Sequence, residues 1–589
     1  MAEALISPGV FLRENDLSQV TAGPVTVGAA LIGPTVIGKP DIPTLVTSYS
    51  QYKAKFGTTF ISHSNTYEYL TSQAAFNYFQ QGGTSLLVTR VASGSYTAAT
   101  SSLISCSIAN TSPFVLETLS VGTIMNNSQG ASTATNGILP SGSASNIRWQ
   151  ITQADSASGL FTLLIRRGDD YTSNQTVLET WTNLSLDPNQ NNYIAYVIGD
   201  QTQNVATDSD GQKYLEITGS YPNTSLYVRV KTVNLPTPNY LNPQGVAYQQ
   251  YTASIPINGS GSENGSFGAA SGPLFGCFGL AALNLFEAIP TVSSTGASSG
   301  TNIQGVFPDN YTTAINLLSN QDQYVYDSIY APGISNQNAS TIISSLLSTV
   351  QNRGDAIAVV DMVGYNQAIS SVTIAAQSYD NSYGATYWPW VQVRSNETGK
   401  LNFVPASVII PGVYEYNDKV SAEWFAPAGL NRGGLPTVIQ PERRLTVGQR
   451  NTLYSGRVNP IAVFPGQGTV VYGQKTLQAR ASALDRVNVR RLLIALKGFI
   501  GQIAQTLVFE QNTAVTRNKF LSQVNPYLDY VQQRQGLYAF RVVMDETNNT
   551  PDVIDRNLLV GAIFLQPTRT AEFIQLDFNI LPTGVTFGA

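Results

Sequence analysis

Short apolar runs alternate with segments of helical periodicity in two separate parts of the chain, residues 21–95 and 305–430. The apolar runs have the length of strands, and the periodic segments have the length of helices. Because strands that alternate with helices build largely parallel sheets covered by helices, we predict one doubly wound α/β domain. This domain contains both parts and is interrupted by the residues between them.

The same pattern locates the elements of this domain. The expected helices are Ser50–Phe56, Thr66–Gln81, Thr312–Ser319, Ser340–Gln351 and Gln367–Tyr379. The expected strands are Val25–Ile32, Ser85–Val91, Tyr324–Ile329, Asp355–Asp361 and Tyr387–Val393. Gly82 and Gly83 end the second helix, because glycine is unfavourable inside a helix.

Residues 96–304 have a different pattern, in which helical periodicity is nearly absent. Strand-like runs such as Phe161–Arg166, Tyr193–Ile198 and Leu226–Val233 are separated by clusters of Ser, Thr, Asn, Gly and Asp. We therefore expect a β-rich insertion of one or two small domains. It should lie on the outer surface, since long insertions are tolerated where they face solvent.

Residues 431–589 contain the longest helical pattern of the chain, within the stretch Tyr454–Thr513. The expected helix, 482–511, opens with a capping sequence at Ser482. Its apolar face consists of Val489, Leu492, Leu493, Leu496, Phe499, Ile500, Ile503 and Leu507. A second helix at 514–533 and strands at Leu537–Met544, Leu558–Gln566 and Glu572–Ile580 complete an expected α+β C-terminal domain.

Both ends of the chain contain a short segment suited to form a strand. At the N-terminal end, within residues 1–20, Val10, Phe11 and Leu12 follow a Pro-Gly turn. At the other end, Ile574, Leu576, Phe578 and Ile580 alternate with polar residues, which is typical of a strand with one solvated face. Each end is either a frayed tail or an arm that orders on a partner.

The composition narrows the class of protein. Charged residues make up only 12% of the 589 residues, and the net charge is −5. Such a chain has no general electrostatic attraction to nucleic acid or anionic membranes. Surfaces rich in uncharged polar side chains suit proteins that pack against many neighbours, and they also suit secreted β-rich proteins.

The cysteines and the apolar segments favour a soluble protein without a disulfide framework. Cys106 and Cys277 lie far apart in the sequence. The first residues lack a basic region followed by an apolar one, so we expect no secretory signal. The apolar run Leu274–Phe286 is too short to span a membrane.

Asp41, His63 and Ser85 follow the chain order of a subtilisin-type catalytic triad. Ser85, however, opens an apolar strand, whereas a nucleophile of that class sits where a loop enters a helix. We interpret His63, the only histidine, as a solvated loop residue. The sequence thus predicts no catalytic site and no enzyme.

Metal and cofactor sites are also not expected. Two distant cysteines and one histidine cannot supply a zinc site. Asp545, Glu546, Asp552 and Asp555 belong to a polar connection between two strands, where a cation remains an alternative. Gly466 and Gly468 fit no phosphate-binding loop pattern and are interpreted as turn residues.

Arg486, Arg490, Arg491 and Lys497 cluster beside the apolar face of the helix at 482–511. One interpretation is a solvated helix edge. Nucleic-acid binding is less favoured, because no aromatic residues interleave with the basic ones. A third interpretation is contact with an acidic protein surface, where basic side chains provide steering and register.

Four sequence elements resemble the tail sheath proteins of contractile bacteriophages. Ile6–Glu14 (ISPGVFLRE) resembles the opening of that family, and Trp424–Asn431 (WFAPAGLN) resembles the segment before its C-terminal domain. Val470–Thr476 (VVYGQKT) is similar to its V-W-G-x-[KR]-T element, with Tyr472 in the Trp position. Val487–Leu492 (VNVRRL) matches its V-N-V-R-R-L helix. The resemblance extends over about 1–95 and 305–589 and does not include 96–300.

The resemblance implies a structural subunit that polymerises helically around a tail tube and contracts to drive the tube through the host envelope. It implies a subtilisin-like shape for the α/β domain and an inner, tube-facing C-terminal domain at 431–589. It also implies arms at both chain ends that add strands to sheets of neighbouring subunits. Val10, Phe11, Leu12, Ile574, Leu576, Phe578 and Ile580 are the arm residues, and Arg486, Arg490, Arg491 and Lys497 are the candidate tube contacts.

The partners implied are further copies of the chain, the tail tube protein, and baseplate and tail terminator proteins, without nucleic acid, cofactor or membrane insertion. The location implied is the virion, with assembly in the host cytoplasm. Two alternatives remain at this point. One is the sheath of a bacterial contractile injection system, and the other is a secreted β-rich adhesin.

Overall fold

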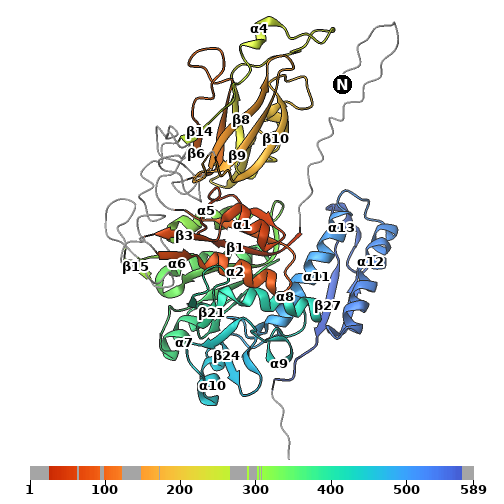
Figure 1. Ribbon diagram of the computed structural model, residues 1–589. Helices are drawn as coiled ribbons and strands as arrows, with labels where there is room; N and C mark the ends of the chain where they lie inside the picture. Colours follow the sequence, from red (N-terminus) through yellow and green to blue (C-terminus); the bar gives the residue numbers. More distant parts are fainter. Residues whose placement is uncertain are drawn as a thin grey trace, which may run out of the picture.

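A six-stranded sheet lies at the centre of the computed structural model (Figure 1). The structure describes residues 26–62, 65–92, 98–121, 147–171, 173–264, 288–290, 301–303, 306 and 308–572. All neighbouring strands of the central sheet pair in parallel except β2, which runs antiparallel to β5. The spatial order is β19 (Gly384–Ala385), β18 (Ile357–Asp361), β17 (Val325–Ser335), β1 (Thr26–Gly33), β5 (Leu86–Arg90) and β2 (Thr44–Val46).

Strand β1 joins the two parts of the chain that flank the insertion. Ala30 pairs with Leu87 of β5 on one side and with Ile329 of β17 on the other. Strands that precede and follow the insertion therefore share one sheet. The predicted combination of α/β and β structure is confirmed at this level.

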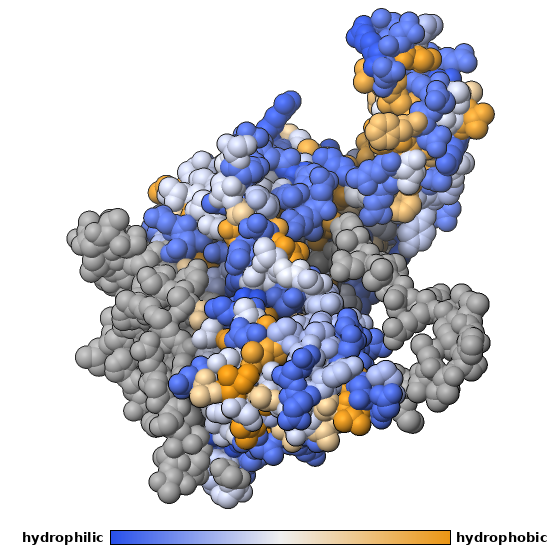
Figure 2. Space-filling view, turned by 90° about the horizontal axis from the view of Figure 1, so that it is seen from above, coloured by the Kyte–Doolittle hydropathy of each residue, from blue (hydrophilic) through white to orange (hydrophobic). Residues whose placement is uncertain are grey.

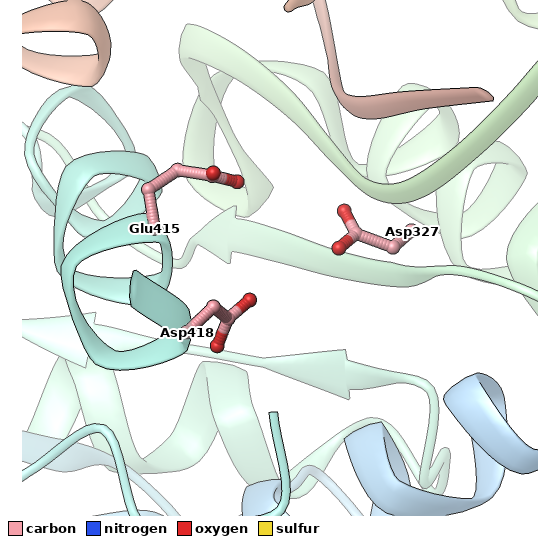
Figure 3. Close-up of side chains that lie close together, drawn as sticks. All are labelled: Asp327, Glu415 and Asp418. Atoms are coloured by element: carbon pink, nitrogen blue, oxygen red, sulfur yellow. The ribbon is translucent and has the colours of Figure 1, made fainter. Parts of the chain in front are cut away.

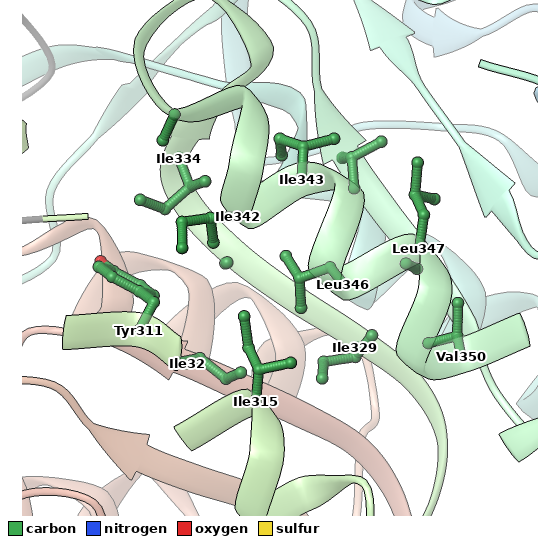
Figure 4. Close-up of a cluster of buried hydrophobic side chains, with 14 of the residues drawn as sticks. Ile32, Tyr311, Ile315, Ile329, Ile334, Ile342, Ile343, Leu346, Leu347 and Val350 are labelled. Carbon is green, nitrogen blue, oxygen red and sulfur yellow. The ribbon is translucent and has the colours of Figure 1, made fainter. Parts of the chain in front are cut away.

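Helices cover both faces of the central sheet. Successive side chains of each strand point to opposite faces, so each strand presents apolar side chains to the helices on both faces. Ala29 and Leu31 pack with α1 (Tyr49–Phe56), α2 (Leu70–Gln80) and α8 (Ile410–Val420). Ala30 and Ile32 pack on the other face, in the cluster that Figure 4 shows. The helices of that face are α5 (Tyr311–Leu318), α6 (Asn336–Arg353) and α7 (Ile369–Gln377).

Three expected elements before residue 430 have a different type or extent in the structure. The helix expected at 66–81 starts only at Leu70, because β4 (Asn65–Glu68) pairs with β3 (Thr59–Ser62) in a hairpin. The run Tyr193–Ile198 forms the short helix α3 (Ile194–Ile198) rather than a strand, an ambiguity that periodicity cannot resolve for short apolar runs. The strand expected at 387–393 is split at Pro389, which lacks a backbone N–H, into β20 (Tyr387–Trp388) and β21 (Val391–Arg394).

The insertion contains a seven-stranded antiparallel sheet that projects from the top of the molecule in Figure 1. The order is β10 (Val177–Ser185), β9 (Leu160–Arg167), β8 (Ile147–Asp155), β14 (Gly259–Asn264), β6 (Ala98–Ser101), β7 (Phe114–Val121) and β13 (Val228–Val233). A hairpin of β11 (Thr202–Thr207) and β12 (Lys213–Thr218), the pair β15 (Ala288–Pro290) and β16 (Thr301–Ile303), and helix α4 (Gln249–Thr252) also belong to it.

The insertion has its own hydrophobic core and contacts the α/β domain through both apolar and polar side chains, with Val205 and Leu215 packed against the core of that domain. Trp149, Phe161 and Ile165 are among the side chains of that core. The Lys39 Nζ atom lies 3.0 Å from both Thr202 Oγ1 and Asn204 Oδ1 of β11. The face of the molecule seen in Figure 2 is mostly hydrophilic, with hydrophobic residues in small separate groups.

Strand pairing crosses the boundary that we expected at residue 430. Two three-stranded sheets, β20–β24–β25 and β22–β21–β23, combine strands from both sides of that residue. Their further members are β22 (Leu401–Val404), β23 (Val438–Pro441), β24 (Asn459–Phe464) and β25 (Gly468–Val471). Helices α9 (Gly429–Arg432) and α10 (Val447–Ser455) lie between these strands in the sequence. Residues 431–471 therefore belong structurally with the segment before them.

The C-terminal unit consists of α11 (Val487–Gln505), α12 (Ala514–Gln533), α13 (Pro551–Asp555) and the hairpin of β26 (Leu537–Val543) and β27 (Ala562–Pro567). The expected helix at 482–511 is shorter because a 3-10 turn, η3 (Ala483–Asp485), precedes it; Ser482 caps this turn and not the helix. The second helix agrees with the prediction at 514–533. The last expected strand, 572–580, lies almost entirely outside the described residues.

No helix in the described ranges combines the length and apolarity needed to cross a bilayer. The core of the C-terminal unit is instead a small cluster between two helices and a hairpin. It includes Trp424, Leu492, Leu496, Phe520, Val524 and Leu528.

We expect Val524→Ala to lower the free energy of unfolding by about 2 kcal/mol, since Val524 is fully buried in this cluster and its truncation leaves a cavity. Val515→Ala on the same helix is the matched control, because Val515 is 78% exposed. Its effect should stay within about 0.5 kcal/mol. Chemical denaturation of both variants checks the prediction, and equal losses would contradict it.

Candidate functional site

Helix α11 connects the C-terminal unit to the α/β domain. Its predicted apolar face is largely confirmed, since Val489, Leu492 and Leu496 are buried. Phe499, by contrast, is 39% exposed and stacks on Tyr527 of α12, with ring centroids 3.8 Å apart. The basic residues lie on the remaining surface of this helix, and their contacts are described next.

Arg491 lies inside the protein, between α11 and α8. Its Nη1 atom donates a hydrogen bond of 2.9 Å to Oδ1 of Asp418, and its Nη2 atom donates to Oδ2 of the same carboxylate. The guanidinium carbon lies 4.5 Å from the ring centroid of Tyr414. A planar guanidinium that is bidentate on one side and stacked on the other is held in a single orientation.

Asp327, Glu415 and Asp418 form an acidic cluster around this arginine. Figure 3 shows Asp327 on β17 and the other two carboxylates on α8. One oxygen from each lies within 4.8 Å of the others. Gly28 of β1 leaves space for the cluster, since a Cβ atom there would lie 3.2 Å from Glu415 Oε1.

Burial and mutual repulsion shift the protonation of this cluster. Burial raises the pKa of Asp327, and the Asp418 charge raises it further, although Arg491 opposes the change. Burial also raises the pKa of Glu415, and the nearby charges of Asp327 and Asp418 act in the same direction. One arginine thus faces three carboxylates, and protonation relieves the excess negative charge.

These three carboxylates are the group of described residues whose oxygens could jointly bind a cation. Arg491 already supplies a positive charge there and forms two hydrogen bonds with Asp418. The contacts therefore support a structural joint between β17, α8 and α11.

Arg490 is also buried and interacts within the subunit. Its guanidinium carbon lies 3.9 Å from the ring centroid of Tyr383, and Nη2 donates to the Ser382 hydroxyl. Burial lowers the pKa of this arginine. Arg490 thus attaches α11 to the loop before β19.

The remaining two basic residues are more accessible. Arg486 is half-buried and forms ion pairs with Asp485 and Glu572. Lys497 is exposed, and its Nζ atom lies 3.1 Å from the Tyr383 hydroxyl. The expectation of one contiguous basic edge is wrong, because the interior carboxylate and tyrosine rings bind two of its four members.

The β26–β27 hairpin is a two-stranded sheet among the described residues. Its strands pair antiparallel from Val543–Ala562 to Leu537–Pro567. Each strand therefore has one edge without a partner in the described part of the subunit. Tyr538 and Phe564 are 65% and 60% exposed on this sheet.

Several residues that the sequence singled out have ordinary structural positions. Ser85 accepts a 2.6 Å hydrogen bond from Tyr78 at its carbonyl, and Cys106 is buried. Gly466 and Gly468 have φ values of 74° and 76° in the β24–β25 turn, as expected for turn glycines. The arm residues Val10, Phe11, Leu12, Ile574, Leu576, Phe578 and Ile580 lie outside the described residues, as do His63 and Cys277.

Four acidic partners of the basic helix were not predicted from the sequence, namely Asp327, Glu415, Asp418 and Glu572. Glu415 and Asp418 are three residues apart on a helix, which places them on one face. The sequence therefore predicts that Glu415 and Asp418 are neighbours. The position of Asp327 next to them depends on the tertiary fold.

We expect the free energy of unfolding to fall as pH rises from about 5 to about 8, since carboxyls with raised pKa values retain protons in the folded state that the unfolded state has released. Glu415→Gln is neutral at every pH and should make this dependence shallower. Denaturation at a series of pH values measures the slope, with exposed Asp552→Asn as the control. A slope unchanged by Glu415→Gln would contradict the assignment.

Two family descriptions match consecutive parts of the chain. Residues 307–477 match the "Phage tail sheath protein central domain", and residues 480–580 match the "Phage tail sheath C-terminal domain". The first match ends after β25, and the second begins shortly before α11. This division agrees with the strand pairing across residue 430.

Curated relatives are similar over less than half of the chain. The tail sheath protein of Vibrio phage KVP40 is 35% identical over 279 residues, covering 46% of this chain and 41% of that protein. The tail sheath protein of Enterobacteria phage T4 is 36% identical over 230 residues, covering 39% of this chain and 35% of that protein. The chain thus spans less than half the length of these relatives in the aligned region.

A crystal structure of a sheath tail protein from Listeria innocua shares the fold. The two chains are 11% identical in sequence. The match covers 89% of this chain and 90% of the Listeria innocua chain, with a TM-score of 0.50. Sequence similarity to the two sheath domains and to curated sheath proteins carries the assignment. Residues 307–477 and 480–580 thus match the two domains of the contractile phage tail sheath family.

Proposed function

We propose that this protein is the repeating subunit of a contractile tail sheath. In this proposal many copies polymerise helically around a tail tube, and the polymer contracts to drive the tube through the host envelope. The matches to the two sheath domains support the proposal, as do the curated relatives named as tail sheath proteins. The observation that carries it is the β26–β27 hairpin, which offers open strand edges for linking subunits.

Strand addition suits such a polymer for a physical reason. Each added strand contributes a row of main-chain hydrogen bonds, and these persist while whole subunits rotate. The acceptor is the open edge of β26 or β27. The donors are the apolar segments at the chain ends, around Val10–Leu12 and Ile574–Ile580. Contacts of this head-to-tail type generate a helical polymer, because they do not close on themselves.

The energy for contraction comes from the difference between two packings of the same subunits, and the subunit acts as a structural protein. The α/β domain takes the subtilisin-like shape that the resemblance implies, which its mostly parallel sheet with helices on both faces supports. The further partners are the tube protein and the baseplate and tail terminator proteins. The protein works in the virion after assembly in the host cytoplasm.

The tube contact involves fewer basic residues than the helical pattern indicates. Arg490 and Arg491 hold α11 inside the subunit, so their role is to position the helix. Lys497 is the exposed member and is the candidate for direct contact with the tube. Arg486 is half-buried, and its side chain is engaged by Glu572.

We expect deletion of residues 1–20, or of 573–589, to leave a folded subunit that no longer forms stable tubes, because each deletion removes a linking strand. Electron microscopy and circular dichroism of each truncated protein measure assembly and folding separately. Removal of the exposed β11–β12 turn, residues 209–211, is the control deletion, since it removes no chain end. Normal tubes from the doubly truncated protein would rule out strand exchange.

We also expect Lys497→Glu to weaken assembly on purified tubes by several fold at low ionic strength, since the change reverses a charge at the interface. Lys213→Glu, in the insertion, is the matched control and should not change assembly. Cosedimentation with tubes over a range of salt concentrations provides the measurement. If both variants bind equally, Lys497 does not contact the tube.

A further inference from the structure

The loop between α11 and α12 exposes apolar side chains on the C-terminal unit. Phe509 is 99% exposed, and Val508 beside it is also exposed. Glu510 follows them and is exposed as well. An apolar side chain that is held in water gains free energy when a second surface covers it. We call Val508, Phe509 and Glu510 the 508–510 loop.

Anchors on both sides hold the 508–510 loop in this exposed position. Leu507, just before it, is buried in the core of the C-terminal unit. Asn512, just after it, donates from Nδ2 to the Leu558 carbonyl at 2.7 Å. Phe509 has a φ of 71°, a left-handed conformation that bulky residues rarely adopt. Strained residues of this kind are concentrated at functional sites, and a fixed loop loses little entropy when it binds a partner.

A second exposed apolar surface lies on α10 and the β24–β25 pair. The Arg450 guanidinium carbon lies 5.1 Å from the ring centroid of Phe464 and 5.7 Å from that of Tyr472. The two rings pack together, with centroids 4.8 Å apart. Val447 is exposed three residues before Arg450, which places both side chains on one face of α10. We call this surface the α10 patch; its members are Val447, Arg450, Phe464 and Tyr472.

The two surfaces carry opposite charges. Arg450 lies over two aromatic rings, and no carboxylate of the described residues forms an ion pair with it. Glu510 likewise forms no ion pair within the part of the chain that the structure describes. Aromatic residues and arginine are enriched in protein interfaces, and opposite charges fix the register of a contact. The 508–510 loop is therefore complementary to the α10 patch in both apolarity and charge.

The two surfaces lie on different parts of the subunit. Figure 1 shows α10 and β24 at the bottom of the molecule, and α12 and α13 at its right side. The 508–510 loop precedes α12, and Asn512 attaches it to Leu558, which follows α13 in the sequence. A contact between the loop and the patch would therefore join two copies rather than close within one.

We propose that the 508–510 loop of one copy binds the α10 patch of a second copy, with Phe509 against the aromatic rings and Glu510 paired with Arg450. This contact is additional to strand addition, and it rests on the proposed function for its place in the sheath. Because the two surfaces differ, each copy uses both at once, and such head-to-tail contacts extend a polymer. A contact of this size is weak alone, so it supports a polymer that other contacts also hold.

A photoreactive side chain at position 509 tests which surface the loop meets. The full-length variant Phe509→benzoylphenylalanine is prepared with and without heavy-isotope labelling, and the two forms are mixed before illumination. We expect cross-linked peptides that contain α10 or Tyr472, with the mixed labelling that only two copies can give. The same probe in place of Tyr214, exposed on β12, is the control and should not label those peptides. Cross-links to any other surface, or only to the tube protein when tubes are present, would overturn the proposal.

Substitutions test the strength and the charge pairing of the contact. Phe509→Ala should raise the protein concentration needed for polymerisation by about tenfold, since aromatic anchors contribute strongly to interfaces. Glu510→Arg and Arg450→Glu should each raise it several fold, and the double variant should regain most of the loss. Glu216→Arg, exposed in the insertion, is the matched control and should change nothing. Thermal melting checks the fold, which Phe509→Ala should preserve because that side chain makes almost no contact within the subunit.

Cross-linking and polymerisation are measured separately, so that the two proposals fail separately. If no tubes form but copies still cross-link at the α10 patch, the contact holds and the proposed sheath function fails. If tubes form and neither Phe509→Ala nor the charge reversals change their formation, the sheath function holds and the contact is overturned. If neither tubes nor this cross-link form, both proposals are overturned.

Discussion

The ion pair between Arg491 and Asp418 is the contact on which the arrangement of this subunit depends. It connects α11 of the C-terminal unit to α8, which packs on the central sheet. Removing one member of a buried pair costs about 3–5 kcal/mol, because the remaining charge lies in a poorly solvated place. Here the cost is increased by Asp327 and Glu415, whose excess negative charge Arg491 offsets. The hairpin therefore keeps a fixed direction relative to the sheet.

Two of the connections between the C-terminal unit and the rest of the subunit differ in their exposure to solvent. The first is α11, which is held by Arg491 and by the stacking of Arg490 on Tyr383. The second is the segment 568–572, which is held at Glu572. The first connection lies inside the protein, while the second is partly exposed. In the proposed sheath, these connections hold the surface that accepts strands in one orientation.

The sequence was sufficient for the features that depend on local pattern. Alternating helices and strands indicated the α/β domain, and the apolar face of α11 was readable from its spacing. Patterns failed where long-range contacts decide. Thr66 and Tyr67 pair in a hairpin instead of starting a helix, and strands after residue 430 return to pair with β20 and β21. The arginines of VNVRRL have the spacing of a basic edge, but carboxylates and rings from distant segments bind them inside the subunit.

The central claim is that copies of this chain are linked by strands added to the β26–β27 hairpin. A cryo-electron microscopy reconstruction of the polymer formed by the purified protein, alone or on tubes, tests it most directly. The account predicts a helical polymer in which this hairpin gains strands from the chain ends of neighbouring copies. A polymer in which the hairpin remains two-stranded, with subunits joined only through side-chain contacts, would contradict it.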